Sequence, residues 1–352
     1  MKIGMDKLEE TILRYRHSRF VVVEPGGNHG DRLIYNGMEK KLKQHQIKYL
    51  VLKYQVCFRL PILSTLFFKF CHRILKVARS ISKLGKSWNL VILKLDRWIY
   101  EKFLRPYKIQ ATPNDVILIH GGGNINDMWH GIRLLKSVLQ HNTNNVLIVG
   151  PQTYWFKETS FPALFTKAKQ AIYLFCREKF SYQLLNSLRL PRNVQVLLSN
   201  DTSFYLSKED FHVCQGYHDL ICLRTDKESA LFQKKEEIEK IFKRLSLAMV
   251  PKRKIFVKDL SRVKDFRDFI HLIETSKKVY TDRLHVAIPA AILGKETVLY
   301  PNSYYKNRGV YDYSLSNYLN VKFAHFPSSL KELKKCIKPI NKRRRTECSK
   351  LH

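Results

Sequence analysis

The sequence predicts an α/β protein built from two Rossmann-like domains that face each other across a cleft. Short runs of Val, Ile and Leu alternate with amphipathic stretches along most of the 352 residues, as buried strands of a parallel sheet alternate with covering helices. The alternation pauses at about residues 205–215 and then restarts. A chain of this length has a prior of about two domains, so we expect one domain on each side of the pause.

The first predicted domain covers residues 1–210. Each of its six predicted strands is a short apolar run that ends near turn-forming residues. Helices are predicted from the turn after the first strand to about residue 44, and over 128–139. The predicted strands are 19–24, 48–54, 115–120, 145–150, 171–176 and 194–198.

The second predicted domain covers residues 211–335, and a basic tail follows at 336–352. Helical periodicity separates its apolar runs in the same way. Two such α/β units with their strand ends turned toward a crevice form a GT-B-like architecture. The predicted strands are 219–224, 254–258, 278–281 and 297–300, and the predicted helices are 227–243, 263–276 and 284–293.

The charge and cysteine content restrict the partner and the compartment. The chain has 63 Lys and Arg against 30 Asp and Glu, a formal charge of +33, which favours an anionic partner. The seven cysteines are scattered, with neither a C-x-x-C pair nor zinc-ligand spacing, so a reducing cytoplasm and no metal site are expected. Residues 1–19 lack the apolar core of a signal peptide, and no uncharged run has the ~20 residues of a membrane span.

One segment, residues 52–113, does not fit the α/β alternation and is interpreted as an insertion. Residues 51–110 hold 13 Lys and Arg against 2 acidic residues. Near residues 67–79 the cations interleave with apolar side chains at roughly helical spacing, which suits an anionic membrane surface. Packing of the apolar face on its own domain is the main alternative, and nucleic-acid binding is a weaker one.

The first strand ends at a turn that is a candidate anion-binding loop. The turn, residues 25–31, reads PGGNHGD. Glycine allows the backbone to approach a ligand, and the next helix presents unpaired N–H groups to an anion. The pattern matches neither a P-loop nor G-x-G-x-x-G, and a structural turn is the alternative. The candidate binding residues are Gly26, Gly27, Asn28 and Asp31.

A second glycine-rich loop, HGGGNIND, follows the third strand at residues 120–127. Consecutive glycines there indicate a close ligand or a facing loop. Asn124 and Asp127 suit hydrogen bonds to sugar hydroxyls, or else cap the next helix. The candidate binding residues are Gly122, Gly123, Asn124 and Asp127.

Two further strand ends carry charged residues. Arg224 is predicted to end the first strand of the second domain, where its planar fork suits a carboxylate or a phosphate. An ion pair with Asp226 or Glu228 is the alternative. His285 lies in the first turn of a predicted helix, where the helix dipole and a bound anion both act on its protonation, and Asp282 and Arg283 precede it.

Taken in order, these pieces resemble the polysaccharide pyruvyl transferase family. The resemblance spans most of the chain and implies a GT-B-like fold, no metal requirement, and phosphoenolpyruvate as co-substrate. It also implies that Arg224, Leu284 and His285 contact phosphoenolpyruvate. The matching pieces are GGNHGD, the strand with GGGN, NVLIVGPQ, CREKFS at 176–181, Asn200-Asp201, LRTDKE and TDRLHVAIPAAILGKETVLYPNSYYKNRG.

The expected function is therefore transfer of a pyruvyl group onto a sugar of a surface polysaccharide or of its lipid-linked precursor, at the inner face of the cell membrane. His285 would donate a proton or contact phosphate, and Arg224 would hold the donor. Secondary cations are expected at Arg283, Lys306 and Arg308, and the glycine loops would line the facing wall. The alternatives are a GT-B glycosyltransferase that uses a nucleotide sugar, and a non-enzymatic basic binder of membrane or nucleic acid. No nucleic-acid recognition signature supports binding to nucleic acid.

Overall fold

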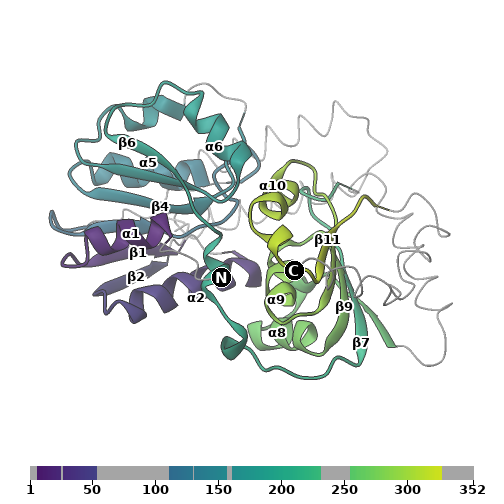
Figure 1. The fold of residues 1–352 in the computed structure, drawn as a ribbon. Helices are drawn as coiled ribbons and strands as arrows, with labels where there is room; N and C mark the ends of the chain where they lie inside the picture. Colours follow the sequence, from purple (N-terminus) through teal and green to yellow (C-terminus); the bar gives the residue numbers. More distant parts are fainter. Residues whose placement is uncertain are drawn as a thin grey trace, which may run out of the picture. The chain divides into compact units, whose positions relative to one another are not determined.

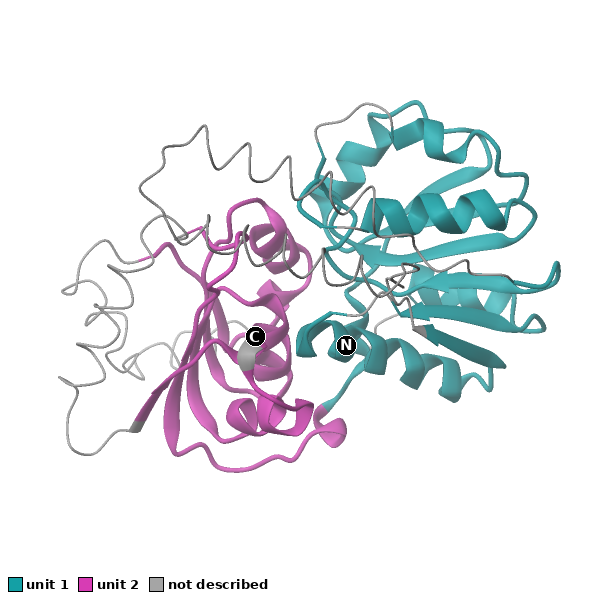
Figure 2. Ribbon diagram, turned by 180° about the vertical axis from the view of Figure 1, so that it is seen from behind, with its two compact units in different colours: residues 1–207 teal, residues 208–352 magenta. Residues whose placement is uncertain are grey.

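The chain folds into two compact units, residues 1–207 and 208–352 (Figure 2). The computed structural model describes residues 6–24, 27–53, 111–129, 131–156, 161–230 and 254–326. Each unit contains one sheet in which all neighbouring strands are parallel. The predicted α/β class with two parallel sheets is confirmed.

The sheet of the first unit has six strands in the order β2-β1-β3-β4-β5-β6 (Figure 1). Its central strands are buried on both faces, which explains their nearly continuous Val, Ile and Leu content. All six coincide with predicted runs. They are β1 (Phe20–Glu24), β2 (Tyr49–Lys53), β3 (Val116–Ile119), β4 (Val146–Gln152), β5 (Ile172–Cys176) and β6 (Val194–Leu198).

Helices cover both faces of this sheet, and alternate strand residues face opposite layers. Val21 packs in the layer that contains Leu135 of α5, whereas Val22 packs in the layer that contains Met38 of α2. The helices are α1 (Lys7–Arg14), α2 (His29–Gln44), α5 (Gly131–His141) and α6 (Lys179–Asn186), with 3-10 turns η1 (Phe161–Phe165) and η2 (Thr202–Tyr205).

The second unit has a five-stranded sheet in the order β11-β10-β9-β7-β8. Helix α9, which is buried along most of its length, packs on β9 and β10. The strands are β7 (His218–Cys222), β8 (Lys254–Val257), β9 (Ser276–Thr281), β10 (Glu296–Leu299) and β11 (Val321–Phe323). The helices are α8 (Phe266–Glu274), α9 (Leu284–Ile292) and α10 (Lys306–Tyr313), with 3-10 turns η3 (Lys208–Asp210), η5 (Leu260–Arg262) and η6 (Leu315–Asn317).

In both sheets the order in which strands are added reverses at the first strand. In the first unit β2 lies on one side of β1 and β3 on the other, and in the second unit β8 and β9 flank β7 in the same way. The crevice at the carboxyl ends of two strands where the order reverses is the usual ligand site of open α/β sheets. The switch points are therefore β1/β3 and β7/β9. Each of the four predicted motifs follows one of these strands: PGGNHGD follows β1, HGGGNIND follows β3, LRTDKE follows β7 and the Arg-Leu-His turn follows β9.

Several boundaries differ from the sequence prediction. Strand β7 ends at Cys222 and not at Arg224, because the Arg224 N–H bonds to a carboxylate and not to a neighbouring strand. Helix α5 begins at residue 131 and not at 128, because the Asn126 side chain holds the backbone N–H groups of Met128 and Trp129 in a turn. Helices α1, α6 and α10 and strand β11 were not predicted at all.

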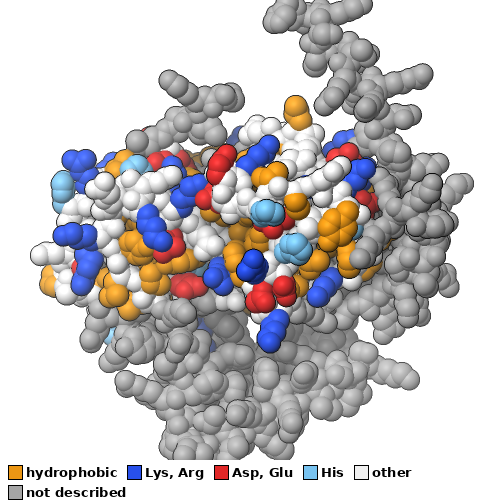
Figure 3. Space-filling view, turned by 90° about the horizontal axis from the view of Figure 1, so that it is seen from below, with side chains coloured by type: hydrophobic (Ala, Val, Ile, Leu, Met, Phe, Trp, Pro, Cys, Tyr) orange, Lys and Arg blue, Asp and Glu red, His pale blue; other side chains and the backbone are white. Residues whose placement is uncertain are grey.

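Some predictions fall outside the described residues. These include nearly all of the 52–113 insertion, most of the 227–243 helix, the 336–352 tail and Gly26. Of the helices within the described ranges, none is both long and apolar enough to cross a membrane. On the face shown in Figure 3, Lys and Arg side chains of described residues are interspersed with acidic and apolar ones and form no continuous basic patch.

Candidate functional site

Arg224 lies two residues beyond β7, and carboxylates hold it from two directions. Its Nε and Nη2 donate to the two carboxylate oxygens of Asp226 at 2.9 and 3.0 Å, and Nη2 also pairs with Glu228 at 3.0 Å. Burial would lower the pKa of Arg224, but Glu228 and Asp226 outweigh it and raise that pKa. The ion pair expected as the alternative thus forms, and the guanidinium is only 8% exposed.

Arg283, at the end of β9, is paired in a similar way. Its Nε and Nη2 donate to the two oxygens of Asp259 at 2.7 and 2.9 Å. Nη2 also donates to Ser261 Oγ at 2.8 Å and lies 3.3 Å from Asp226 Oδ2. Asp226 therefore contacts the arginines of both strand ends that flank the β7/β9 switch point.

Asp259, just after β8, joins three neighbouring strand ends. It accepts hydrogen bonds from Thr225 N and Oγ1 at 3.2 and 2.7 Å, in addition to those from Arg283. Burial would raise the pKa of Asp259, but the hydrogen bonds from Arg283 and Thr225 outweigh it and bring that pKa to about 2. The carboxylate is therefore ionised at neutral pH and fixes the loops that follow β7, β8 and β9.

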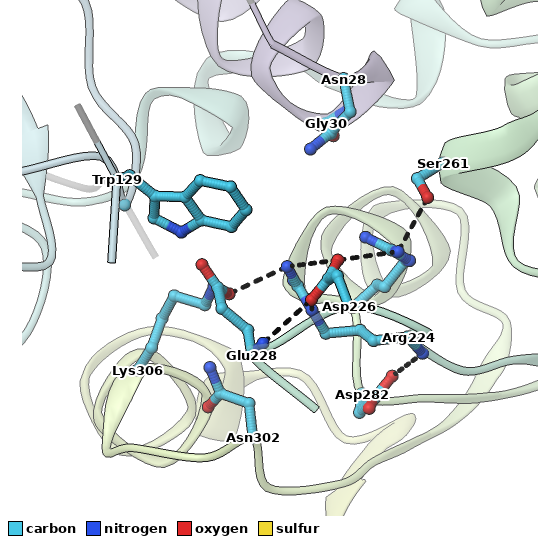
Figure 4. A network of polar contacts seen from close by, with 12 residues as sticks. Asn28, Gly30, Trp129, Arg224, Asp226, Glu228, Ser261, Asp282, Asn302 and Lys306 are labelled. Atoms are coloured by element: carbon cyan, nitrogen blue, oxygen red, sulfur yellow. Dashed lines mark hydrogen bonds and ion pairs between the residues drawn. The ribbon is translucent and has the colours of Figure 1, made fainter. Parts of the chain in front are cut away.

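Glu228 brings the amino end of α10 into the same network. Its carboxylate accepts a hydrogen bond from Lys306 Nζ while it pairs with Arg224, and its carbonyl accepts from Ser303 N at 2.9 Å. In Figure 4 the side chains of Asp226 and Glu228 adjoin the Arg224 guanidinium, and Lys306 lies beside Glu228 on the side away from Arg224. We call the following six residues the charged cluster, which balances three cations against three carboxylates: Arg224, Asp226, Glu228, Asp259, Arg283 and Lys306.

Asp282 lies under this cluster and is completely buried. Its Oδ1 accepts the Arg224 N–H at 2.7 Å, whereas Oδ2 has no hydrogen-bond partner among the described residues. Burial, which outweighs the nearby arginines, raises the pKa of Asp282 to about 6. The carboxyl group thus sets the course of the backbone at Arg224 and is partly protonated near neutral pH.

The Arg-Leu-His turn lies beside the cluster, at the start of α9. Leu284 is buried and His285 is half-buried in the first helical turn. No side chain caps this helix at Arg283, so its amino end offers partial positive charge to an anion. Arg308 lies apart from the cluster, because its side chain is exposed on α10 and pairs with Asp312 at 2.8 Å.

In the first unit the β1–α2 turn is closed by its own side chains. Asn28 Oδ1 accepts from Gly30 N at 2.8 Å, and Asp31 Oδ2 accepts from Asn28 N at 2.9 Å, a capping box at the start of α2. Gly27 has φ +151°, and a Cβ there would lie 1.9 Å from Asp31 Oδ2. A structural turn, the alternative to an anion-binding loop, therefore accounts for Gly27, Asn28 and Asp31.

The glycine loop after β3 runs beside the end of β4. A Cβ on Gly121 would lie 2.7 Å from the Pro151 carbonyl oxygen, and Gly122 N donates to that oxygen at 2.9 Å, so a facing loop explains the close approach. Gly123 accepts from the Asn126 side chain at 2.8 Å. The residue that holds the next turn is Asn126, whereas the sequence favoured Asn124 or Asp127.

Asn124 and Asp127 differ in their surroundings. The Asn124 backbone N–H donates to Gln152 Oε1 at 3.2 Å, and its carbonyl accepts from Gly131 N. Asp127 is exposed, and its N–H donates to the Trp155 carbonyl. Both residues thus lie in the loop after β3, beside the β1/β3 switch point, and their roles toward a sugar stay predictions.

Arg177 and Asp201 form a fully buried ion pair that sequence reasoning did not single out. Arg177 Nη1 donates to Asp201 Oδ2 at 2.7 Å, and Nε donates to Thr153 Oγ1 at 2.8 Å. The side chains are 1% and 0% exposed. Breaking such a pair leaves an uncompensated buried charge, so this contact fixes the ends of β4, β5 and β6. No three His, Cys, Asp or Glu side chains gather as a metal site in the described ranges.

Comparison with known proteins places this arrangement in a family context. A family model described as "Polysaccharide pyruvyl transferase" matches residues 28–304, a range that includes the charged cluster except Lys306. A Bacillus subtilis protein named as a pyruvyl transferase, EpsO, is 25% identical over 261 residues, which cover 66% of this chain and 76% of EpsO.

Two solved structures align with most of the chain. A functionally uncharacterised protein from Klebsiella pneumoniae aligns with a TM-score of 0.58 and 22% identity, covering 90% of this chain and 97% of that one. The Escherichia coli heptosyltransferase WaaC aligns with a TM-score of 0.36 and 11% identity, over 91% of this chain and 98% of WaaC. The first of these shows a shared fold.

We expect Asp282→Asn to stabilise the protein above about pH 6 but not at pH 4. A carboxyl whose pKa is raised from 3.8 to about 6 on folding contributes stability below pH 4 that is lost as the pH rises through 6. The shift of about two pKa units corresponds to roughly 3 kcal/mol, and Asn keeps an oxygen for the Arg224 N–H. Urea unfolding of the parent and the variant at several pH values measures the difference between their free energies of unfolding. A difference that does not change with pH would contradict the prediction.

Proposed function

The chain belongs to the polysaccharide pyruvyl transferase family, and we propose that it transfers the pyruvyl carbons of phosphoenolpyruvate to two hydroxyls of one sugar as a cyclic ketal. The family indicates a transferase that acts on polysaccharide. The proposed acceptor is a sugar of a surface polysaccharide or of its lipid-linked precursor. No cofactor is proposed beyond phosphoenolpyruvate as co-substrate.

One observation carries the proposed donor: Arg224, Arg283 and Lys306 gather at the β7/β9 switch point, next to the uncapped amino end of α9. Phosphoenolpyruvate has a carboxylate and a phosphate close together. A guanidinium fork binds either group in a bidentate way, a Lys ammonium acts as a point charge, and helix N–H groups donate hydrogen bonds to anions. The site thus offers three kinds of hydrogen-bond donor to an anion.

His285 is the proposed proton donor, because it lies in the first turn of α9 beside these cations. In the proposed reaction the methylene carbon of phosphoenolpyruvate takes a proton, and C2 becomes electrophilic. A sugar hydroxyl then attacks C2 and loses its proton, inorganic phosphate leaves, and the second hydroxyl closes the ketal and loses its proton. General acid catalysis of such a step typically contributes 10²–10⁴-fold.

The competing function is glycosyl transfer from a nucleotide sugar, since the fold does not fix the chemistry. The two reactions release different products. Incubation of the protein with acceptor and phosphoenolpyruvate would release inorganic phosphate, whereas incubation with a nucleotide sugar would release a nucleotide. Release of nucleotide, with no phosphate from phosphoenolpyruvate, would overturn the proposal.

Replacement of Arg224 by Lys should weaken phosphoenolpyruvate binding at least tenfold. The substitution keeps the charge but loses the bidentate fork, and hydrogen bonds to charged groups contribute about 1.5–3 kcal/mol. Calorimetric titration measures the dissociation constant, with Arg308→Lys, on the exposed side of α10, as the matched control. Normal donor binding by Arg224→Lys would show that this side chain is purely structural.

The His285→Gln and His285→Ala variants separate proton donation from ligand contact. Glutamine keeps a hydrogen-bond donor but delivers no proton, so both variants should lose about 10²-fold or more in kcat, and glutamine should retain donor affinity better than alanine. Steady-state kinetics with saturating phosphoenolpyruvate measures kcat. Activity of His285→Gln within a few-fold of the parent would eliminate proton donation by this residue.

We also propose that the basic segment at 52–113 holds the protein on the inner, anionic face of the cell membrane. This rests on its sequence alone. The Gln variants of Lys69, Arg73, Lys76 and Arg79 should lose co-sedimentation with anionic vesicles, because each cation contributes about 1 kcal/mol, and binding of the parent should fall with salt. If the parent stays in the supernatant at low salt, the segment has another role.

A further inference from the structure

Asp226 occupies the edge of the Arg224 guanidinium that an incoming carboxylate would need. Its two oxygens accept from Nε and Nη2 of the guanidinium at 2.9 and 3.0 Å, which is the parallel, bidentate geometry of carboxylate recognition by arginine. Glu228 takes a further contact to Nη2 at 3.0 Å. The best anion-binding edge of Arg224 is therefore filled by a carboxylate of the same loop.

We propose that Asp226 is an intramolecular competitor of the donor, which leaves Arg224 when a ligand carboxylate binds and returns when the site empties. The proposal rests on the proposed function, in which Arg224 binds phosphoenolpyruvate, and it assigns the carboxylate of that donor to the Nε–Nη2 edge. Asp226 then sets the affinity and the preference for ligands that carry a carboxylate.

Exposure distinguishes Asp226 from the other members of the charged cluster. Its side chain is 32% exposed, whereas those of Glu228 and Asp259 are 3% and 5% exposed. An exposed carboxylate regains hydration when it leaves its partner, while a buried one would lose its partner without gaining water. Of these three carboxylates, Asp226 can therefore leave at the lowest cost.

The pairing pattern also allows Asp226 to leave without releasing the arginines. Arg224 would keep Glu228, and Arg283 would keep both oxygens of Asp259 together with Ser261. The Asp226 side chain also accepts a hydrogen bond from the Glu228 N–H at 3.0 Å, which is a local contact within the turn. Departure of Asp226 would thus open one edge of a guanidinium that stays oriented.

Charge balance favours exchange over simple addition. The cluster pairs three cations with three carboxylates, so an added anion would meet no net positive charge there. If the donor carboxylate replaces Asp226, Arg224 keeps the same number of bidentate anionic partners. Exchange of one carboxylate for another preserves the bidentate geometry at the Nε–Nη2 edge of Arg224.

The first test compares donor affinity in the full chain for the parent, Asp226→Asn and Asp268→Asn. Asp268 is an exposed carboxylate in the first turn of α8, so its variant controls for the loss of one negative charge from the same unit. The phosphoenolpyruvate dissociation constant should fall about fivefold for Asp226→Asn, the range of a partly exposed ion pair, and not for Asp268→Asn. An increase, or no difference from the control, would overturn the proposal.

The second test needs no donor, so it separates this proposal from the proposed function. Phenylglyoxal modifies accessible guanidinium groups, and peptide mass spectrometry locates the products. Arg224 should be labelled several times faster in the Asp226→Asn variant than in the parent. The labelling rate of Arg283, still held by Asp259, should change little. Equal Arg224 labelling in both proteins would overturn the competitor role. Failure of the parent to bind phosphoenolpyruvate would overturn the proposed function instead.

Discussion

The carboxylate of Asp259 is the contact on which the second unit's site depends. It is a short side chain at the end of an edge strand, yet it binds the backbone and hydroxyl of Thr225 and both donor atoms of the Arg283 fork. Three loops that are far apart in sequence are thereby held at one point. Without this carboxylate, Asp226 at 3.3 Å would be the remaining acidic partner of Arg283 among the described residues, and the loop carrying Arg224 would lose its hydrogen bonds at Thr225.

The two units share one strand order but treat their switch points differently. In both, the second strand lies on one side of the first and the later strands continue on the other, although the sequence contains no recognisable repeat. The first unit closes its switch point with backbone approaches, such as that of Gly121 to Pro151. The second closes it with paired charges.

The sequence predicts the positions of the buried strands well, and it predicts the contacts between side chains less well. The central strands are apolar enough on both faces to be located within a residue or two, because parallel sheets bury both sides. Strand β11 has only three residues, one of them Lys322, and helix α1 is short and mostly polar, so neither carries a clear periodic signal. Arg224 and His285 were singled out by their positions at predicted strand ends, and the resemblance to a family added the expectation that they contact phosphoenolpyruvate.

There is a different reason why Asp259 was not singled out. It is a single acidic residue in an ordinary stretch of sequence, and its importance arises only when the topology brings several strand ends together. Arg177 and Asp201 were noticed as parts of two separate motifs, but the pairing of these residues, 24 positions apart, was not predicted. Pairing between distant charged residues requires the tertiary fold, whereas strand burial is encoded locally.

The register of β1 has a kinetic consequence. Val22 pairs with Leu118, so the central strand of the first sheet must wait for a partner that is synthesised after the whole 54–110 segment. The entropy of closing a connection grows only logarithmically with its length, roughly 0.6 kcal/mol per doubling, so the native state tolerates such a segment. Folding rates fall as contacts become less local. On the ribosome, β1 and β2 are therefore expected to remain a two-stranded intermediate with an unsatisfied edge, vulnerable to aggregation until β3 emerges.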